Sequence, residues 1–259
     1  MDTLALEREG AVAVVRLDRP PVNAVNRKMM SELRDCFAEL GEDRAVNSVV
    51  LSATGDRAFC AGIDLAEVAA GAEEQRSVAD TLDPGRYWRD TQQCIRHCPV
   101  PVIAAADRAA IGAGFGLVGV CDLVVASETA TFSLTEINVG LLGGAAKALR
   151  MLGPFKARMM LFSGQPLTAG ELHRLGAVEA VVPPGEAERE AVSLAQRLAS
   201  KSPIALRLAK ESVLRIEGSE LEDSYRTEQD YTQRMKTFND SREARAAFKE
   251  KREAVWTWS

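Results

Sequence analysis

The sequence predicts an α/β protein with a helical C-terminal region. Short apolar runs rich in β-branched residues alternate with helical patterns along the first two thirds of the chain, which is the arrangement of an α/β core. After about residue 185 only helical patterns rich in Glu, Lys, Arg and Ala occur. The 259 residues are 46% hydrophobic and 27% charged, an ordinary globular balance. We expect a core over residues 1–195 and a helical region over residues 196–259.

The individual elements follow from apolar runs and from helix start signals. The predicted strands cover residues 11–17, 48–53, 100–106, 122–126 and, briefly, 132–134. Asn26 precedes apolar residues at helical spacing that stop near Gly41, so a helix is expected between them. The more polar stretch 67–96 is interpreted as a mobile or helical insertion. Further helical patterns lie at residues 186–201, 204–217, 221–238 and 241–253.

Charge and cysteine content limit the partners and the compartment. The formal net charge is −5, so there is no net positive field to attract nucleic acid or anionic lipid. The longest uncharged apolar run, residues 109–121, is too short to span a bilayer. Five cysteines and a start without a signal-peptide pattern are typical of reduced thiols in the cytoplasm. We therefore expect a cytoplasmic protein with no membrane segment and no nucleic-acid partner.

The most unusual segment is the glycine-rich stretch from Ile111 to Gly119. Its four glycines are costly inside a regular element, so the backbone must be approached closely there. One interpretation is a tight turn into a helix whose first amides, including that of Ala113, face an oxyanion or a phosphate. Close helix packing is the alternative. A dinucleotide-binding turn is disfavoured, because the next predicted strand follows too soon for a crossover helix.

A second segment, residues 58–65, follows a strand with small residues and a glycine. Asp64 is placed to cap a helix that begins at Leu65. The amide of Ile63, just before that helix, would be a second exposed donor.

The chemistry also needs a group that carries protons. Glu136 lies among apolar residues and is the preferred acid/base candidate. The two histidines, His97 and His173, are more often structural at such positions. Cys94, His97 and Cys98 form at most a weak metal-binding pattern, and we expect no metal.

Several motifs together resemble a known family. Residues 58–65 (Ala-Phe-Cys-Ala-Gly-Ile-Asp-Leu) resemble the A-F-x-A-G-x-D-L motif of the enoyl-CoA hydratase/isomerase (crotonase) superfamily. Residues 99–122, with Pro-Val-Ile-Ala-Ala, Ile-Gly-Ala-Gly and Cys-Asp-Leu, are similar to its second signature. Asn23-Ala24-Val25 resembles its N-terminal motif, and residues 176–183 and 247–252 also match. The motifs arrive in the family's order and cover almost the whole chain.

This resemblance implies a crotonase-like spiral of ββα units whose C-terminal helical region mediates trimers, often paired into hexamers. It also implies an acyl-CoA substrate, with coenzyme A as part of that substrate and no permanently bound cofactor. The amides of Ile63 and Ala113 would hold the thioester oxygen, which becomes negative when an enolate forms. The residues expected around that oxygen are Ala61, Gly62, Asp64, Gly112 and Gly114.

The chain departs from the hydratase pattern at Gly116. In the family alignment Glu136 is the second of two glutamates that hydratases use, and the first falls at Gly116, which has no side chain. One carboxylate suffices to move a proton between two carbons, so we lean to double-bond isomerisation. A 2-enoyl-CoA hydratase with a second acid from residues 67–90, another reaction of the superfamily such as decarboxylation or hydrolysis, and a non-catalytic CoA-ester-binding protein remain alternatives.

The phosphates of coenzyme A need cations. The expected residues are Arg27, Lys28, Lys249 and Lys251, with solvated surface charge as the alternative for all four. Tyr87 and Trp88 are candidates to line the acyl pocket.

Overall fold

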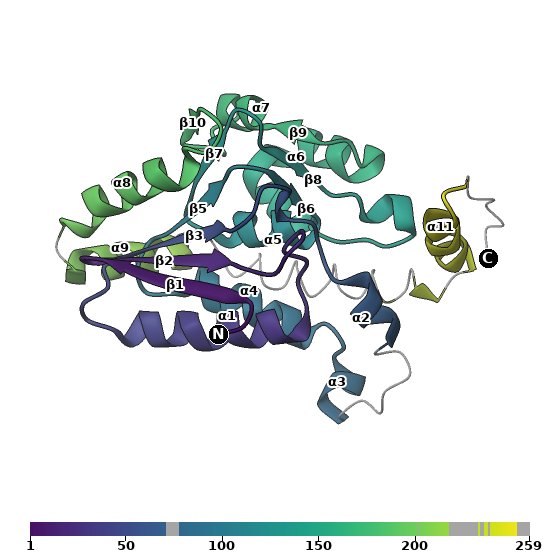
Figure 1. Cartoon of the computed structure of the whole chain (residues 1–259), viewed down its shortest axis with the longest axis horizontal. Coiled ribbons are helices and arrows are strands. Elements are labelled where there is room, and N and C mark those ends of the chain that lie inside the picture. The colour runs from purple at the N-terminus through teal and green to yellow at the C-terminus, as the bar shows by residue number, and fades with distance from the viewer. Residues whose placement is uncertain (71–77, 202, 218–232, 234–235, 238, 253–259) are drawn as a thin grey trace.

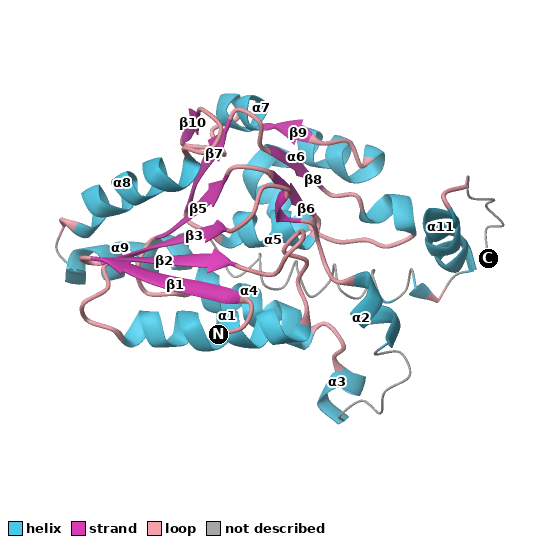
Figure 2. Ribbon diagram, viewed as in Figure 1, coloured by secondary structure: helices cyan, strands magenta, loops and turns pink. Residues whose placement is uncertain are grey.

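The computed structural model describes residues 1–70, 78–201, 203–217, 233, 236–237 and 239–252. Two sheets of mostly parallel strands form the framework (Figure 2). The larger sheet has the order β1 (Leu4–Glu9), β2 (Val12–Leu17), β3 (Ser48–Ala53), β5 (Val102–Ala106), β7 (Leu123–Ser127) and β10 (Ala180–Val182). The smaller sheet has the order β4 (Ala58–Cys60), β6 (Ala109–Ile111), β8 (Thr131–Ser133) and β9 (Leu167–Thr168).

The order of the strands along the chain makes a spiral. β3 is followed by β4, β5 by β6 and β7 by β8, so each pair gives one strand to the larger sheet and the next to the smaller sheet. Helical segments then lead back to the larger sheet. The repeating ββα unit confirms the predicted α/β class and spiral.

Helices surround both sheets (Figure 1). In the first half they are α1 (Arg27–Glu42), α2 (Leu65–Ala70), α3 (Val78–Leu82), α4 (Arg86–Arg96) and α5 (Ala113–Val120). In the second half they are the 3₁₀ turn η1 (Glu136–Val139), α6 (Ala145–Ser163), α7 (Ala169–Arg174), α8 (Ala187–Ala199), α9 (Pro203–Ile216) and α11 (Asn239–Glu250).

The larger sheet is buried on both faces, which explains its continuous apolar runs. On β2, Ala13 and Val15 pack in the cluster that contains the apolar side of α1, whereas Val12 and Val14 pack with α8. Figure 1 shows α1 and α8 on opposite sides of the sheet. The helix α8 runs from Ala187 to Ala199 and covers the second face of the sheet. The expected boundary at residues 195/196 therefore falls inside a helix of the core. The division into two regions stays a prediction.

Most sequence predictions of individual elements agree with the structure. Asn26 caps α1 through its side-chain oxygen, which accepts from the Met29 amide at 2.9 Å. The stretch 67–96 contains α3 and α4, and Ile95 of α4 is fully buried, so α4 belongs to the core. β1 was not expected, because its polar, half-exposed sequence carries little strand signal. The helical pattern at 221–238 lies almost wholly outside the described residues.

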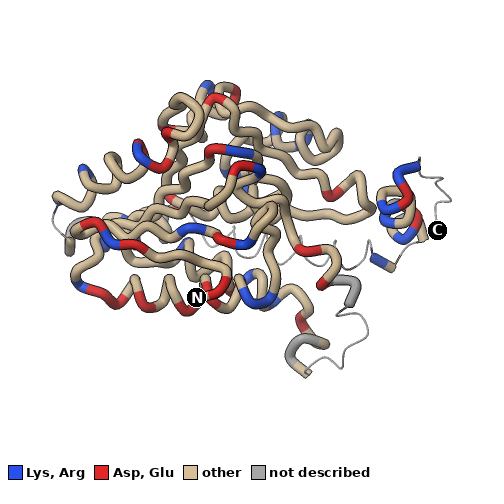
Figure 3. The backbone as a smooth tube through the Cα atoms, viewed as in Figure 1, with Lys and Arg blue, Asp and Glu red and all other residues tan. Residues whose placement is uncertain are grey.

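None of the helices in the described ranges has both the length and the apolar character needed to cross a bilayer. Acidic and basic residues are both scattered along the backbone (Figure 3).

Candidate active site

Two bends of the chain begin next to each other at one edge of the smaller sheet. β4 and β6 are parallel neighbours, with Cys60 opposite Ala110. Because parallel strands end at the same edge, the segments that follow them, residues 61–65 and 112–116, share that edge. These are the two glycine-containing segments that the sequence singled out.

The first bend is held from one side by Val25. The Val25 amide donates to the Gly62 carbonyl oxygen at 2.8 Å, and the Asp64 amide donates to the Val25 carbonyl oxygen at 2.8 Å. This is the parallel-bridge pattern between Val25 and Ile63, in which the bridged residue's own N–H points away from its partner. The Ile63 amide is therefore directed to the side opposite Val25. Gly62 has a φ of 112°, which favours glycine.

Asn23 ties the Val25 segment to β4. Its side-chain oxygen accepts from the Arg19 amide at 2.8 Å, and its side-chain nitrogen donates to the carbonyl oxygens of Thr54 at 2.9 Å and Ala58 at 3.2 Å. The residue is buried and has a φ of 53°, a conformation that asparagine tolerates better than most residues. Asn23 thus positions the first bend from a distance of about forty residues along the chain.

Asp64 begins α2, as the sequence predicted. Its carboxylate accepts from the amides of Ala66 at 3.0 Å and Glu67 at 3.3 Å, and pairs with the Arg19 guanidinium at 2.6 Å. Burial disfavours the charged form of Asp64, but the bonds from Arg19 and the two amides outweigh it. The pKa of Asp64 is therefore lowered from its ordinary value.

The second bend is the N-terminal end of α5, which starts at Ala113 as expected. Gly112 has φ 54° and ψ −110° and supplies no side-chain cap. Its amide donates to the Ser133 carbonyl oxygen at 2.9 Å, and its carbonyl oxygen accepts from the Gly116 amide at 2.9 Å. Ala113 is the first helical residue, so its N–H has no partner within the helix and points out of the positive end of the helix dipole.

The two bends touch. A Cβ added at Gly62 would lie 3.5 Å from the Ile111 carbonyl oxygen. A Cβ added at Gly114 would overlap the Cys60 carbonyl oxygen and lie 2.9 Å from the Cys60 Cβ. The structure thereby brings together the residues expected around a thioester oxygen, namely Ala61, Gly62, Ile63, Asp64, Gly112, Ala113 and Gly114.

Glu136 reaches this region from η1. A Cβ added at Gly112 would lie 3.0 Å from the Glu136 Oε1 atom, and one added at Gly143 would lie 3.1 Å from it. The Glu136 side chain therefore lies between two glycines, against the residue that precedes Ala113. Its Oε2 atom is buried. A carboxylate beside the start of α5 is suitably placed to exchange protons with a ligand held there.

Position 116, where the family resemblance expects the first of the two glutamates, faces an amide and an indole instead. A Cβ added at Gly116 would lie 2.7 Å from the Gln92 Nε2 atom and 3.6 Å from the Trp88 Cζ2 atom. Trp88 was an expected pocket residue, whereas Gln92 was not identified from the sequence. Gln92 is spaced from Trp88 and Ile95 so that it lies on the buried side of α4. This helical periodicity in the sequence could have identified Gln92 as a buried residue.

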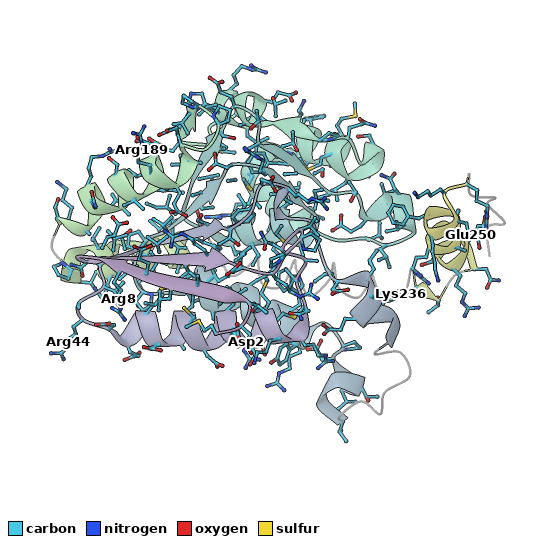
Figure 4. All side chains as sticks on the ribbon, in the orientation of Figure 1. Asp2, Arg8, Arg44, Arg189, Lys236 and Glu250 are labelled. Carbon is cyan, nitrogen blue, oxygen red and sulfur yellow. The ribbon has the colours of Figure 1, made fainter. Side chains whose placement is uncertain are left out.

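The expected phosphate-binding cations come from the start of α1 and the end of α11. Arg27 starts α1 and lies 5.7 Å from the centre of the Tyr87 ring. Lys28 pairs with Asp2 at 3.0 Å and with Glu32 at 3.5 Å (Figure 4 labels Asp2 beside α1). Lys249 and Lys251 are exposed at the end of α11, the helix that carries Glu250 in Figure 4. That helix packs against η1, since the Ser241 hydroxyl donates to the Gly140 carbonyl oxygen at 2.7 Å.

The histidine and cysteine side chains have structural surroundings. The His173 Nδ1 atom lies 2.8 Å from the Val178 carbonyl oxygen, at the end of α7. Burial raises the pKa of the Cys60 thiol to about 12 and that of Cys94 to about 12. These thiols are protonated at neutral pH and are poor nucleophiles.

The architecture is that of the crotonase fold. Carnitinyl-CoA hydratase from Mycobacterium avium has a solved structure that superposes with a TM-score of 0.88 at 30% identity, covering 100% of both chains. A probable enoyl-CoA hydratase from Rhizobium meliloti is 34% identical over 98% of this chain and 97% of its own. A (7aS)-7a-methyl-1,5-dioxo-2,3,5,6,7,7a-hexahydro-1H-indene-carboxyl-CoA hydrolase from Mycobacterium tuberculosis is 33% identical over 94% of this chain and 96% of its own.

The model of the enoyl-CoA hydratase/isomerase family matches residues 7–258, almost the whole chain. The protein therefore belongs to this family and is an enzyme that acts on acyl-CoA.

Proposed function

We propose that this enzyme forms the enolate of an acyl-CoA thioester and uses it to move a double bond from the 3-position to the 2-position of the acyl chain. The amides of Ile63 and Ala113 bind the thioester oxygen, and Glu136 is the acid and base. The observation that carries the proposal is that Glu136 lies against Gly112 while Gly116, the position of the first hydratase glutamate, faces Gln92 and Trp88.

The mechanism needs only one titrating side chain. Glu136 removes a proton from the acyl C2, and the electron pair moves to the thioester oxygen. The two amides stabilise the negative charge on that oxygen, each by on the order of a hundredfold in rate or more. Glu136 then returns the proton to C4, so the double bond ends between C2 and C3 and the carboxylate is regenerated.

The test offers 3-hexenoyl-CoA and 2-hexenoyl-CoA to the wild-type enzyme and to Glu136→Gln. Conjugation is followed by absorbance and water addition by chromatography. We expect conjugation of the 3-enoyl ester to exceed hydration of the 2-enoyl ester, and to fall by about 10²–10⁴-fold in the variant. Hydration that dominates and survives Glu136→Gln would reject both the reaction and the role of the carboxylate.

Hydration and hydrolysis are the competing reactions. Hydration is the activity in the names of several relatives and would need a second acid, for which residues 67–90 are the remaining source. Hydrolysis is favoured by the 33% identity to a hydrolase of an indene-carboxyl-CoA together with the absence of a carboxylate at position 116. Release of free coenzyme A from saturated and unsaturated esters, detected with a thiol reagent, separates hydrolysis from the other two.

The phosphates of coenzyme A are assigned to Arg27, Lys28, Lys249 and Lys251, the last two in the same or a neighbouring subunit.

Self-association to a trimer or hexamer is supported by an exposed apolar stripe on α6. Phe155, Met159 and Phe162 lie at helical spacing there and are 83%, 62% and 76% exposed.

A charge on that stripe tests self-association. We expect Phe162→Asp to shift the mass measured by light scattering from a trimer or hexamer to the monomer, because a buried carboxylate without a partner is costly at an interface. Leu175→Asp, at an exposed position after α7, is the matched control and should leave the mass unchanged. Equal masses for wild type and Phe162→Asp would show that α6 does not form the interface.

A further inference from the structure

Two polar side chains lie against glycines at the start of α5. Gly112 and Gly116 are one helical turn apart, as the bond from the Gly116 amide to the Gly112 carbonyl oxygen shows. Glu136 lies against the first glycine and Gln92 against the second, at 3.0 Å and 2.7 Å from the built Cβ positions. The carboxamide therefore lies against the first turn of α5, and the carboxylate lies against the residue that precedes this turn.

Gln92 is unusual among the buried residues of this region. It is only 4% exposed, and its Oε1 atom is buried and accepts no hydrogen bond from any described residue. Buried polar groups in proteins are nearly always hydrogen-bonded, so one without a partner needs an explanation, such as a bound water or a ligand. Leu or Met at position 92 would fill the same space without this cost. Packing of α4 on α5 therefore does not account for an amide here.

We propose that Gln92 is a specificity-determining residue, whose carboxamide hydrogen-bonds a hydroxyl group on the acyl chain of the CoA ester. A hydroxyl both donates and accepts, and it matches the acceptor and the donor of one carboxamide. This inference rests on the proposed site, in which the acyl chain runs from the two amides past Glu136. The site would then select hydroxyacyl-CoA esters over plain acyl-CoA esters of the same length.

The charge of the group matters as well. In the family pattern a glutamate occupies position 116, whereas Gln92 brings a neutral amide to that space. A second carboxylate beside Glu136 would repel the negative charge of the enolate. The amide recognises a polar atom without this repulsion. Trp88 borders the same position with its apolar ring.

The test measures binding without turnover. In the Glu136→Gln background, calorimetry compares butyryl-CoA with 3-hydroxybutyryl-CoA and 4-hydroxybutyryl-CoA. We expect at least one hydroxy ester to bind about tenfold more tightly than butyryl-CoA, since a site built to bind a hydroxyl rejects the analogue that lacks it. Adding Gln92→Met should remove this preference and leave the affinity for butyryl-CoA within about twofold.

Two further measurements separate recognition from folding. Gln93→Met, one position along α4 on a half-buried side chain, is the matched control and should keep the preference. Gln92→Met should unfold at the same or a higher denaturant concentration than the parent, because it removes a buried unsatisfied acceptor. If neither hydroxy ester is preferred, or if the preference survives Gln92→Met, the proposal is wrong. Because no turnover is measured, this outcome does not depend on which reaction Glu136 catalyses.

Discussion

The two bends that offer backbone amides are built in different ways. The first, at Gly62 and Ile63, is held by side chains and backbone from another part of the chain, through Val25, Asn23 and the pair between Arg19 and Asp64. The second, at Gly112 and Ala113, is held by backbone bonds to Gly116 and Ser133 and, within the described part of the chain, not by side chains, and its packing depends on glycines. The first bend is thus sensitive to lost polar contacts, and the second to added carbon atoms.

This difference gives the site two independent supports. Most of the polar contacts that hold the first bend are only partly buried, and each contributes modestly to the free energy of unfolding. In the second bend, a Cβ added to a glycine overlaps backbone atoms, and moving a side chain cannot relieve that overlap. We therefore expect the largest effects from changes in the second bend.

The strongest test of the second bend is Gly114→Ala. The added Cβ overlaps the Cys60 carbonyl oxygen, so the start of α5 must move away from the first bend. We expect kcat/KM to fall by about 10²–10³-fold, the cost of losing one oxyanion donor. Gly170→Ala in α7 is the control, because a Cβ there meets nothing within 4 Å. Equal losses in both variants would contradict the assigned contact.

The corresponding test of the first bend is Asn23→Ala. It removes three hydrogen bonds of a buried side chain and leaves alanine at a φ of 53°. We expect a loss of about 2–4 kcal/mol in the free energy of unfolding, measured with urea. Asn23→Gly tolerates the backbone conformation and should recover part of the loss. A variant as stable as wild type would show that Asn23 does not hold the bend.

The smallest effect is expected for Arg19→Met, and it depends on pH. The pKa of Asp64 is lowered in the folded protein, so its charge stabilises the fold above its ordinary pKa of about 3.9 and this stabilisation is lost as the pH falls below that value. Removing Arg19 should therefore cost about 1 kcal/mol at pH 7 and clearly less at pH 3.

A residual difference at pH 3 is expected for this variant, because Arg19 also donates to the Ala24 carbonyl oxygen at 2.9 Å. Urea unfolding of both proteins at the two pH values gives the comparison. An unfolding difference that does not change with pH would show that the ion pair does not contribute.

Local patterns predicted the parts of the site that depend on backbone. Gly112 and Gly62 mark bends in which glycine is needed, and Asp64 marks a helix start, so each was visible in a short segment. Motif order then gave the family and the spiral of ββα units. The strands β1, β4, β6, β9 and β10 were not predicted, because short or polar strands have little periodicity of their own and form only beside a neighbour.

By itself, the sequence determined the α/β class, the family and the two glycine-containing bends, since these depend on local backbone preferences and on motifs read in order. Only the tertiary structure decided which side chain faces Gly116 and that Asn23 and Arg19 support the first bend. Those contacts join residues from about 24 to about 45 positions apart, and their pairing depends on how helices and strands pack rather than on any local pattern.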